Sequence, residues 1–295
     1  MSTHSLALIA TIAFIVGGTM ADETARTDVS AAAPSVVTIT ATDYAFQAPD
    51  TIAAGFTTFR LVNNSDQLHM AQIIRLEPGR TMEEYLQAYS EAFRTRGPRP
   101  TWAPRAGGPG AAPPHGTSSA TQYLEPGTYL WECHMNPPPD RIPHVVTKRM
   151  AKAFVVRSTG GVTPPRTPPN ADVVVRLIDY GFMLSPALTP GRHVIRVESA
   201  GAEPHEIALM KLAPGAITED TLQKVRDWMQ NPDGPPPASV SAGSLVGGVS
   251  SLAPGREAYF EVDLTSGSYV LFCFVTAPDG RPHTAHGMVQ HIRIN

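Results

Sequence analysis

The segment GSYVLFC at residues 267–273 decides the fold of this 295-residue chain. It opens with a glycine, continues with an aromatic and several apolar residues, and ends at Cys273, a pattern typical of a β-strand that begins at a turn. The segment GTYLWEC at residues 127–133 has the same pattern and ends at Cys133. Two such strands, with their cysteines 140 residues apart, predict an internal repeat whose units have the size of whole domains.

The repeat extends to both sides of these segments. Residues 64–76 (NSDQLHMAQIIRL) align with residues 201–212 (GAEPHEIALMKL), and each stretch carries a histidine after a polar turn. A proline-rich stretch without apolar periodicity lies between the units, as is typical of a linker. We therefore predict one domain over residues 34–157, a linker over residues 158–171 and a second domain over residues 172–295.

Short strands with turn signals between them dominate each unit. Runs of alternating or β-branched apolar residues predict strands over residues 36–41, 57–62, 151–156, 173–178, 193–197 and 289–294. The sequences at residues 125–129 and 265–269 look like hairpin turns between the strands around them. One helix is expected in each unit, over residues 81–89, which begin with a capping-box pattern, and over residues 218–229. The chain is therefore predicted to be all-β, with two tandem β-sandwiches that each contain one inserted helix.

Four residues that suit a copper site recur in the same order in both units. They are His69, Cys133, His144 and Met150 in the first unit, and His205, Cys273, His283 and Met288 in the second. A mononuclear copper site for electron transfer uses two imidazoles, one thiolate and a weak axial thioether. The recurrence of the whole set favours a metal site over a collection of separate structural residues.

This pattern resembles the cupredoxins, the blue-copper family of plastocyanin and azurin. Residues 267–273 resemble the family's Gly-x-Tyr-x-Phe/Tyr-x-Cys strand, and residues 283–289 are similar to its His-x4-Met segment. Each of the two units resembles the family, and together they cover nearly all of the chain after its first residues. It implies a Greek-key sandwich in each unit and one or two copper ions per chain. It also implies that the histidines and the cysteine are strong ligands, with Met150 and Met288 as axial ligands.

Two features of the sequence depart from the family pattern. The loops from cysteine to histidine, at residues 134–143 and 274–282, are longer than those usual in the family. In the first unit, Lys148 and Arg149 place two positive charges near the predicted metal. Repulsion between these charges and the metal lowers the affinity expected for Cu(II).

The two cysteines also allow other interpretations. A disulfide is the default for an exported protein with two cysteines, but equivalent positions in separate sandwiches would hold the sulfurs beyond bonding distance. A buried cysteine can instead serve as a small apolar side chain. Duplication of a metal-free domain would preserve the same residues, so the repeat is stronger evidence for a common fold than for a common metal.

These residues predict a copper-binding protein that works in electron transfer or copper handling, with a redox partner protein. A metal-free cupredoxin-like binding module of the cell envelope is the alternative. A copper oxidoreductase is a third hypothesis, because His134 directly follows Cys133. Multicopper oxidases and nitrite reductases have a histidine beside the copper cysteine. Those enzymes also carry His-x-His pairs, which this chain lacks.

Composition and the first residues indicate the compartment. The net charge is −3 and only 17% of residues are charged, so there is no basic surface field of the kind that nucleic-acid binding requires. Residues 1–21 are predicted to be a signal peptide, with an apolar run over residues 6–16 and small residues near the cleavage point. We therefore expect a periplasmic or secreted protein with no membrane span after cleavage.

Overall fold

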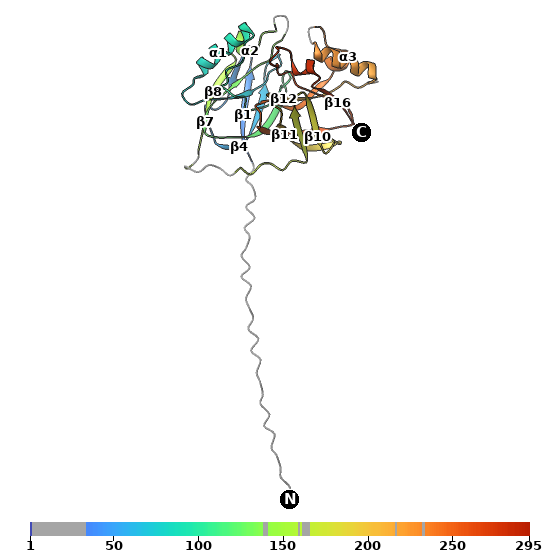
Figure 1. Cartoon of the computed structure of the whole chain (residues 1–295), viewed down its shortest axis with the longest axis horizontal. Coiled ribbons are helices and arrows are strands. Elements are labelled where there is room, and N and C mark those ends of the chain that lie inside the picture. The colour runs from blue at the N-terminus through green and yellow to red at the C-terminus, as the bar shows by residue number, and fades with distance from the viewer. Residues whose placement is uncertain (2–33, 138–140, 159, 161–165, 216, 232–233) are drawn as a thin grey trace. The chain divides into compact units, whose positions relative to one another are not determined.

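The computed structural model describes Met1 and residues 34–295, except residues 138–140, 159, 161–165, 216 and 232–233. The described residues from 34 onwards belong to one compact unit, whose strands and helices are shown in Figure 1. Apart from Met1, the predicted signal peptide at residues 1–21 lies outside the described residues. Within the described part of the chain, no helix is long and apolar enough to cross a bilayer.

The described residues of the first unit contain eight strands. They are β1 (Ser35–Thr42), β2 (Ala45–Gln47), β3 (Thr51–Ala53), β4 (Gly55–Asn63), β5 (Gln72–Leu76), β6 (Thr117–Leu124), β7 (Gly127–Glu132) and β8 (Ala151–Arg157). Burial alternates along β4 and β6, so each presents one face to the core and one to the outside. In contrast, β7 is almost wholly buried over its last four residues, because it lies between the sandwich core on one face and a helix on the other.

Eight further strands lie within the part of the second unit that the structure describes. They are β9 (Val173–Ile178), β10 (Gly181–Ser185), β11 (Gly191–Ser199), β12 (His205–Lys211), β13 (Ser244–Leu252), β14 (Glu257–Leu264), β15 (Gly267–Phe272) and β16 (Val289–Ile294). In β11 the buried and partly exposed positions alternate, as the sequence predicts. The strand β15, which ends just before Cys273, repeats the near-complete burial of β7.

Each unit forms a two-layer sandwich. In the first unit the strands β6-β4-β1-β2 face the sheet β3-β8-β7-β5, and in the second unit β10-β9-β11-β14 face β13-β12-β15-β16. The buried apolar residues between the layers form one cluster in each unit, and these clusters include Cys133 and Cys273. In the first cluster Trp131 stacks on Phe154, with ring centroids 3.8 Å apart. The all-β prediction with two sandwiches is confirmed.

The segments at residues 125–129 and 265–269 carry the chain from one layer to the other. Strand β6 belongs to the larger sheet, whereas β7 pairs with β5 and β8, so the predicted hairpin is wrong. The Tyr129 hydroxyl donates to the Glu125 carbonyl at 2.9 Å, and Tyr269 makes the equivalent bond in the second unit at 2.8 Å. Such a tyrosine corner stabilises a change of sheet. The glycine and polar residues of these segments also occur in hairpin turns, which is why the sequence pattern predicts a hairpin here.

The helices α1 (Met82–Thr95) and α3 (Glu219–Gln230) confirm the two helix predictions. Thr81 accepts a hydrogen bond from the Glu84 N–H at 3.2 Å, and the Glu84 carboxylate accepts one from the Thr81 N–H at 2.8 Å, which completes a capping box. Thr218 caps α3 through its side chain. Each helix packs its apolar face on the smaller sheet of its own unit. Among the residues that the structure describes, three single-turn helices add to the predicted one per unit: α2 (His144–Thr147), α4 (Ala238–Ser241) and η1 (His283–His286).

The two units are joined along both layers, a contact that we call the seam. In one layer β6 and β14 meet through the pair Thr121 and Tyr259, so strands of both units form a single eight-stranded sheet. In the other layer residues 105–112 lie between the edge strands β5 and β13 and form isolated bridges with residues on both sides. The domain bounds 34–157 and 172–295, and the linker between them, stay predictions.

Backbone hydrogen bonds close the seam in the second layer. The N–H of Gly107 donates to the Ser251 carbonyl at 3.0 Å, and the Ser250 N–H donates to the Gly108 carbonyl at 2.9 Å. The buried Gln72 side chain also donates to the Ser251 carbonyl, at 2.9 Å. By sequence alignment, residues 105–112 hold the place in the first unit that β13 holds in the second. The seam therefore pairs equivalent segments of the two units with each other.

An ion pair between His193 and Asp172 makes the stability of the second sandwich depend on pH. The Nδ1 atom of His193 lies 2.5 Å from Oδ2 of Asp172, and the imidazole is only 10% exposed. Burial disfavours the charged imidazole, but the bonds to Asp172 and to the Thr189 carbonyl outweigh it and raise the pKa of His193, while the pKa of Asp172 is lowered. A raised histidine pKa stabilises the fold below the unfolded value of about 6.5, and this stabilisation is lost as the pH rises through the folded value.

We expect Asp172→Asn to lower the free energy of unfolding by about 0.5 kcal/mol at pH 5.5 and by less at pH 8.5, because Asp172 is half exposed and solvent screens the pair. Urea unfolding of the metal-free protein at both pH values measures the difference. Asp263→Asn, at another exposed carboxylate of the same sandwich, is the control. A loss of equal size at both pH values would contradict the assignment.

Candidate metal centres

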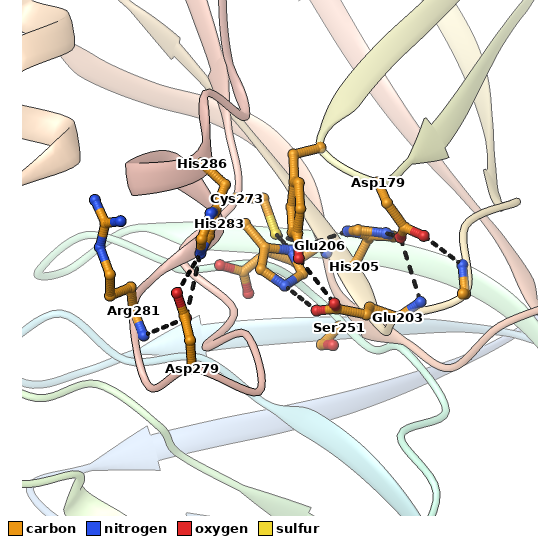
Figure 2. A network of polar contacts seen from close by, with 12 residues as sticks. Asp179, Glu203, His205, Glu206, Ser251, Cys273, Asp279, Arg281, His283 and His286 are labelled. Carbon is orange, nitrogen blue, oxygen red and sulfur yellow. Dashed lines mark hydrogen bonds and ion pairs between the residues drawn. The ribbon is translucent and has the colours of Figure 1, made fainter.

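Three side chains of the second unit converge inside its sandwich, and we call them the second centre: His205, Cys273 and His283. The Nδ1 atoms of the two histidines are 3.0 Å apart, and the Cys273 sulfur is 3.4 Å from Nδ1 of His283. All three residues are fully buried, and Figure 2 shows their side chains gathered at one point. The donor atoms all lie within 4.8 Å of one another, a spacing that suits ligands of a single ion.

The first unit repeats this arrangement in a first centre: His69, Cys133 and His144. The Cys133 sulfur is 3.5 Å from Nδ1 of His69 and 3.6 Å from Nδ1 of His144. The first two residues are fully buried, and His144 is 3% exposed. The structure thus brings together six of the eight predicted ligands in two groups of three, one in each sandwich.

Regular elements position the three residues of the second centre. His205 is the first residue of β12, Cys273 directly follows β15, and His283 opens the single turn η1. The His283 N–H donates to the Val275 carbonyl at 2.8 Å, and the Thr284 N–H donates to the Cys273 carbonyl at 3.1 Å. These two bonds fix the return of the long loop after the cysteine, so the length of the loop does not prevent a defined geometry.

The same two bonds hold the loop of the first centre. The His144 N–H donates to the Met135 carbonyl at 2.9 Å, and the Val145 N–H donates to the Cys133 carbonyl at 2.9 Å. His144 opens α2 as His283 opens η1. The matching backbone contacts show that both loops return the later histidine to the cysteine in the same way. Residues 138–140 of the first loop lie outside the described residues.

The two methionines lie next to their centres along the chain. Met150 and Met288 are fully buried. The Met150 N–H donates to the His144 carbonyl at 3.2 Å, and the Met288 N–H donates to the His283 carbonyl at 3.0 Å. These contacts place each methionine backbone beside the histidine of its own centre. The role of the two thioethers as axial ligands stays a prediction.

Both cysteines are free, so the prediction that they do not form a disulfide is confirmed. Burial raises the pKa of Cys133 to about 12 and raises the pKa of Cys273 as well. The Glu206 N–H points at the Cys273 sulfur, 3.5 Å away. In the absence of a metal both sulfurs are therefore thiols at neutral pH, and a metal that binds them must displace a proton from each.

The far side of each imidazole in the second centre contacts a carboxylate. The Nε2 atom of His205 is 2.6 Å from Oδ1 of Asp179, and Nε2 of His283 is 3.0 Å from Oε2 of Glu203, as the dashed lines of Figure 2 indicate. Burial favours the neutral carboxyl of Asp179, but hydrogen bonds from the Ala202 N–H and from His205 outweigh it and lower its pKa. Each Nε2 therefore carries the proton, and each Nδ1 presents a lone pair to the interior.

This arrangement of protons makes the second centre a site for a cation. Two lone pairs face each other across 3.0 Å in a buried space, which is unfavourable unless a cation lies between them. Burial and the neighbouring His205 lower the pKa of His283, which keeps this imidazole neutral and its Nδ1 lone pair available to a metal.

The spacing and the chemistry of the donors fit a copper ion. Metal bonds of about 2.0 Å to nitrogen and about 2.3 Å to sulfur place a nitrogen and a sulfur of a trigonal site about 3.7 Å apart. The observed distances between nitrogen and sulfur of 3.4 to 3.6 Å are close to that value. Two imidazoles and one thiolate, with a methionine next to the group, are the donors of a blue-copper site.

Two tyrosines cover the histidines that open α2 and η1. Tyr180 meets His283 edge to face with ring centroids 5.0 Å apart, and Tyr44 meets His144 in the same way at 5.1 Å. The His–Cys–His–Met pattern of the sequence does not include these tyrosines or the carboxylates Asp179 and Glu203. The Asp-Tyr dipeptide recurs at residues 43–44 and 179–180, and this is the signal that could have found the tyrosines and Asp179.

The cations beside the first centre behave differently from each other. Arg149 forms an ion pair with Glu83 at 2.5 Å and is thereby directed to α1. The Lys148 ammonium lies 5.0 Å from the centroid of the Tyr44 ring. Since Tyr44 contacts His144, Lys148 does lie near the first centre, and it is one of the two positive charges that the sequence predicts there.

The other histidines that the sequence suggested near the centres, His134 and His286, contact other side chains. His134 forms an ion pair with the buried Glu132 and stacks on Tyr89. His286 lies 3.1 Å from Asp279 and stacks on Tyr180. Over the ranges that the structure describes, the first and second centres are the only groups of His, Cys, Asp or Glu with the spacing of metal ligands.

Comparison with known proteins adds the following findings. No protein-family model and no curated protein sequence matches the chain. Among solved structures, auracyanin A, a "blue" copper protein from Chloroflexus aurantiacus, is 23% identical over 42% of this chain and 99% of its own, with a TM-score of 0.30. Auracyanin from Roseiflexus castenholzii is 20% identical over 41% of this chain and 94% of its own, with a TM-score of 0.28. A multicopper oxidase is 11% identical over 88% of each chain, with a TM-score of 0.23.

TM-scores of this size add nothing to the architecture derived above, which rests on the chain's own strands and contacts. Each unit has two facing sheets, a tyrosine corner and a strand that ends at a buried cysteine. In each unit the histidine that follows this cysteine returns to meet an earlier histidine. The chain therefore consists of two cupredoxin-like sandwiches, each of which encloses a buried His–Cys–His group.

Proposed function

We propose that this chain is an exported copper protein that binds one copper ion at each centre and works in electron transfer. The observation that carries the proposal is the convergence of two imidazoles and one sulfur, all buried, in both sandwiches. Copper bound by such donors supplies a one-electron redox couple. Export and the exchange of electrons with a partner protein are parts of the proposal that rest on the sequence.

The residues of the chain supply a rigid and dry environment for this couple. The cysteine is held at the end of a central strand, and the later histidine is held by backbone bonds at both ends of its loop. Tyr44 and Tyr180 cover the histidines, which leaves the ligands almost without solvent exposure. Donors that are already close to their bound spacing need to move little when the charge of the ion changes.

The two other functions considered from the sequence have less support. A copper oxidoreductase of the kind suggested by His134 needs further ligands near that residue, but His134 is bound to Glu132, and the described residues contain no third ligand group. A metal-free binding module would leave the Nδ1 lone pairs of His205 and His283 opposed in the core. That cost favours a bound cation.

The proposal predicts that copper stabilises the folded chain strongly. A ligand that binds only the native state adds about 4 kcal/mol per site at a free concentration 1,000 times its Kd. For a chain of this size we expect the melting midpoint to rise by roughly 10 °C. Native mass spectrometry should count two copper ions per chain, and calorimetry with zinc in place of copper tests metal preference. An unchanged midpoint and no bound copper would overturn the proposal in favour of the metal-free module.

A further inference from the structure

The surroundings of the two centres differ at positions that the repeat makes equivalent. Glu203, which contacts His283 in the second centre, aligns with Gln67 in the first unit. The Gln67 amide donates to the Tyr44 hydroxyl at 2.7 Å, whereas Tyr180 donates its own hydroxyl to Glu203 at 2.8 Å. A neutral amide thus replaces a carboxylate, and the direction of the hydrogen bond to the tyrosine is reversed.

The second difference concerns the earlier histidine. Asp179 lies 2.6 Å from Nε2 of His205, but its counterpart Asp43 is exposed. Within the described residues, the buried Nε2 of His69 has no carboxylate at hydrogen-bond distance. The charge of Asp43 still acts on His69, but the first centre lacks a carboxylate bonded to this ligand, which the second centre has.

A glycine explains why the aspartate reaches the imidazole in only one unit. A Cβ at Gly201 would lie 2.2 Å from Oδ1 of Asp179 and 2.6 Å from Nε2 of His205. In the first unit Ser65 aligns with this glycine, and its hydroxyl is bonded to Asn63 at 2.9 Å. The second unit keeps room for the carboxylate where the first unit carries a side chain.

The charges beside the histidines of the two centres act in the same direction as these contacts. Asp179 and Glu203 bring negative charge to the outer edges of both imidazoles in the second centre (Figure 2). Near the first centre, Lys148 brings a positive charge over Tyr44. Negative charge and hydrogen-bond acceptors behind a ligand make it a stronger donor and favour the more positive state of the metal. The oxidised ion is therefore stabilised more at the second centre than at the first.

We propose that the two centres have a fixed order of reduction potential, with the second centre lower than the first. This inference rests on the proposed function, because it requires copper at both centres. An electron then lowers its free energy by passing from the second centre to the first. In that step Cu(I) at the second centre becomes Cu(II), Cu(II) at the first centre becomes Cu(I), and no other reagent is consumed. The chain is thus a carrier with a built-in direction, which accepts electrons at the second centre and delivers them from the first.

Single-centre proteins test the order. Cys133→Ala leaves only the second centre and Cys273→Ala leaves only the first, and redox titration of each copper-loaded protein measures one potential. We expect the equilibrium for electron transfer from the second to the first centre to favour the product at least tenfold, which is 59 mV for one electron. Equal potentials, or the reverse order, would overturn the inference while leaving copper binding intact. Absence of copper from both proteins would overturn the proposed function and the inference together.

Exchange of the equivalent residues tests the cause of the order. Glu203→Gln, made in the protein that keeps the second centre, is expected to raise that potential, and Gln67→Glu in the other protein is expected to lower the potential of the first centre. Glu261→Gln is the matched control, since Glu261 pairs with Arg192 on the surface of the second sandwich. If Glu203→Gln shifts the potential no more than this control does, the carboxylates do not set the order.

Discussion

Copper-loaded Cys273→Ala is expected to hold one copper ion per chain instead of two and to lose about half of the visible absorption that thiolate ligation of Cu(II) produces. Cys273 is the sulfur of the second centre, 3.4 Å from Nδ1 of His283. Loss of an outer partner of a metal ligand already weakens binding about 10- to 100-fold, so removal of the ligand itself should weaken it by more. Copper counting and absorption spectra of the same sample give both results.

The mirror variant Cys133→Ala supplies the internal control. It should also keep one ion, and the double variant should keep none at micromolar copper. Alanine leaves a cavity no larger than a sulfur atom in each core, so the copper-free variants should unfold as cooperatively as the original chain. Retention of two ions in the double variant would show that surface groups, and not the buried centres, bind the metal.

Gly108→Ala is expected to destabilise the chain strongly. Gly108 has φ +113, and a Cβ there would lie 2.3 Å from the Ala71 carbonyl oxygen, a backbone atom that cannot turn away. Backbone strain of this kind costs about 1–3 kcal/mol, and overpacking adds about 1–3 kcal/mol. We expect a loss of about 4 kcal/mol in the free energy of unfolding, measured by urea denaturation.

Gly79→Ala separates the two causes of this loss. Gly79 also has positive φ, +86, but nothing lies within 4 Å of the Cβ that the change would add. Its expected cost is therefore the backbone strain alone, about 1 kcal/mol. If the two variants lose the same stability, close packing of residues 105–112 against the strand that follows His69 is not what makes Gly108 necessary.

The three residues that meet at each centre can be predicted from the sequence because chemistry restricts metal ligands to a few residue types. His205, Cys273 and His283 recur in order with His69, Cys133 and His144, and ligand identity survives changes in loop length. The carboxylates behind the ligands are less restricted. Glu203 has no acidic counterpart in the first unit, so the repeat gives no signal for it. Its role depends on where the side chain of His283 turns, which the sequence does not show.

The strands are predicted better than their partners. Apolar alternation locates β4 and β11 because one face of each strand is buried. The choice of partner depends on contacts between distant segments, and a turn at residues 125–129 has the same composition whether it closes a hairpin or changes sheet. Residues 105–112 illustrate the same limit. They have the glycine and proline content of a loop, yet they complete the layer between β5 and β13.

The seam has a consequence for how such a chain can arise. Its bridges run antiparallel between segments that occupy the same position in their own units, which is the geometry of an isologous contact in a twofold dimer. A single sandwich of this kind would have a sheet edge that can pair with the same edge of a second copy. Fusion of two genes would then turn a concentration-dependent association into an intramolecular one. Once linked, the two copies are free to diverge, and an exchange as small as glutamate for glutamine can give them unequal tasks.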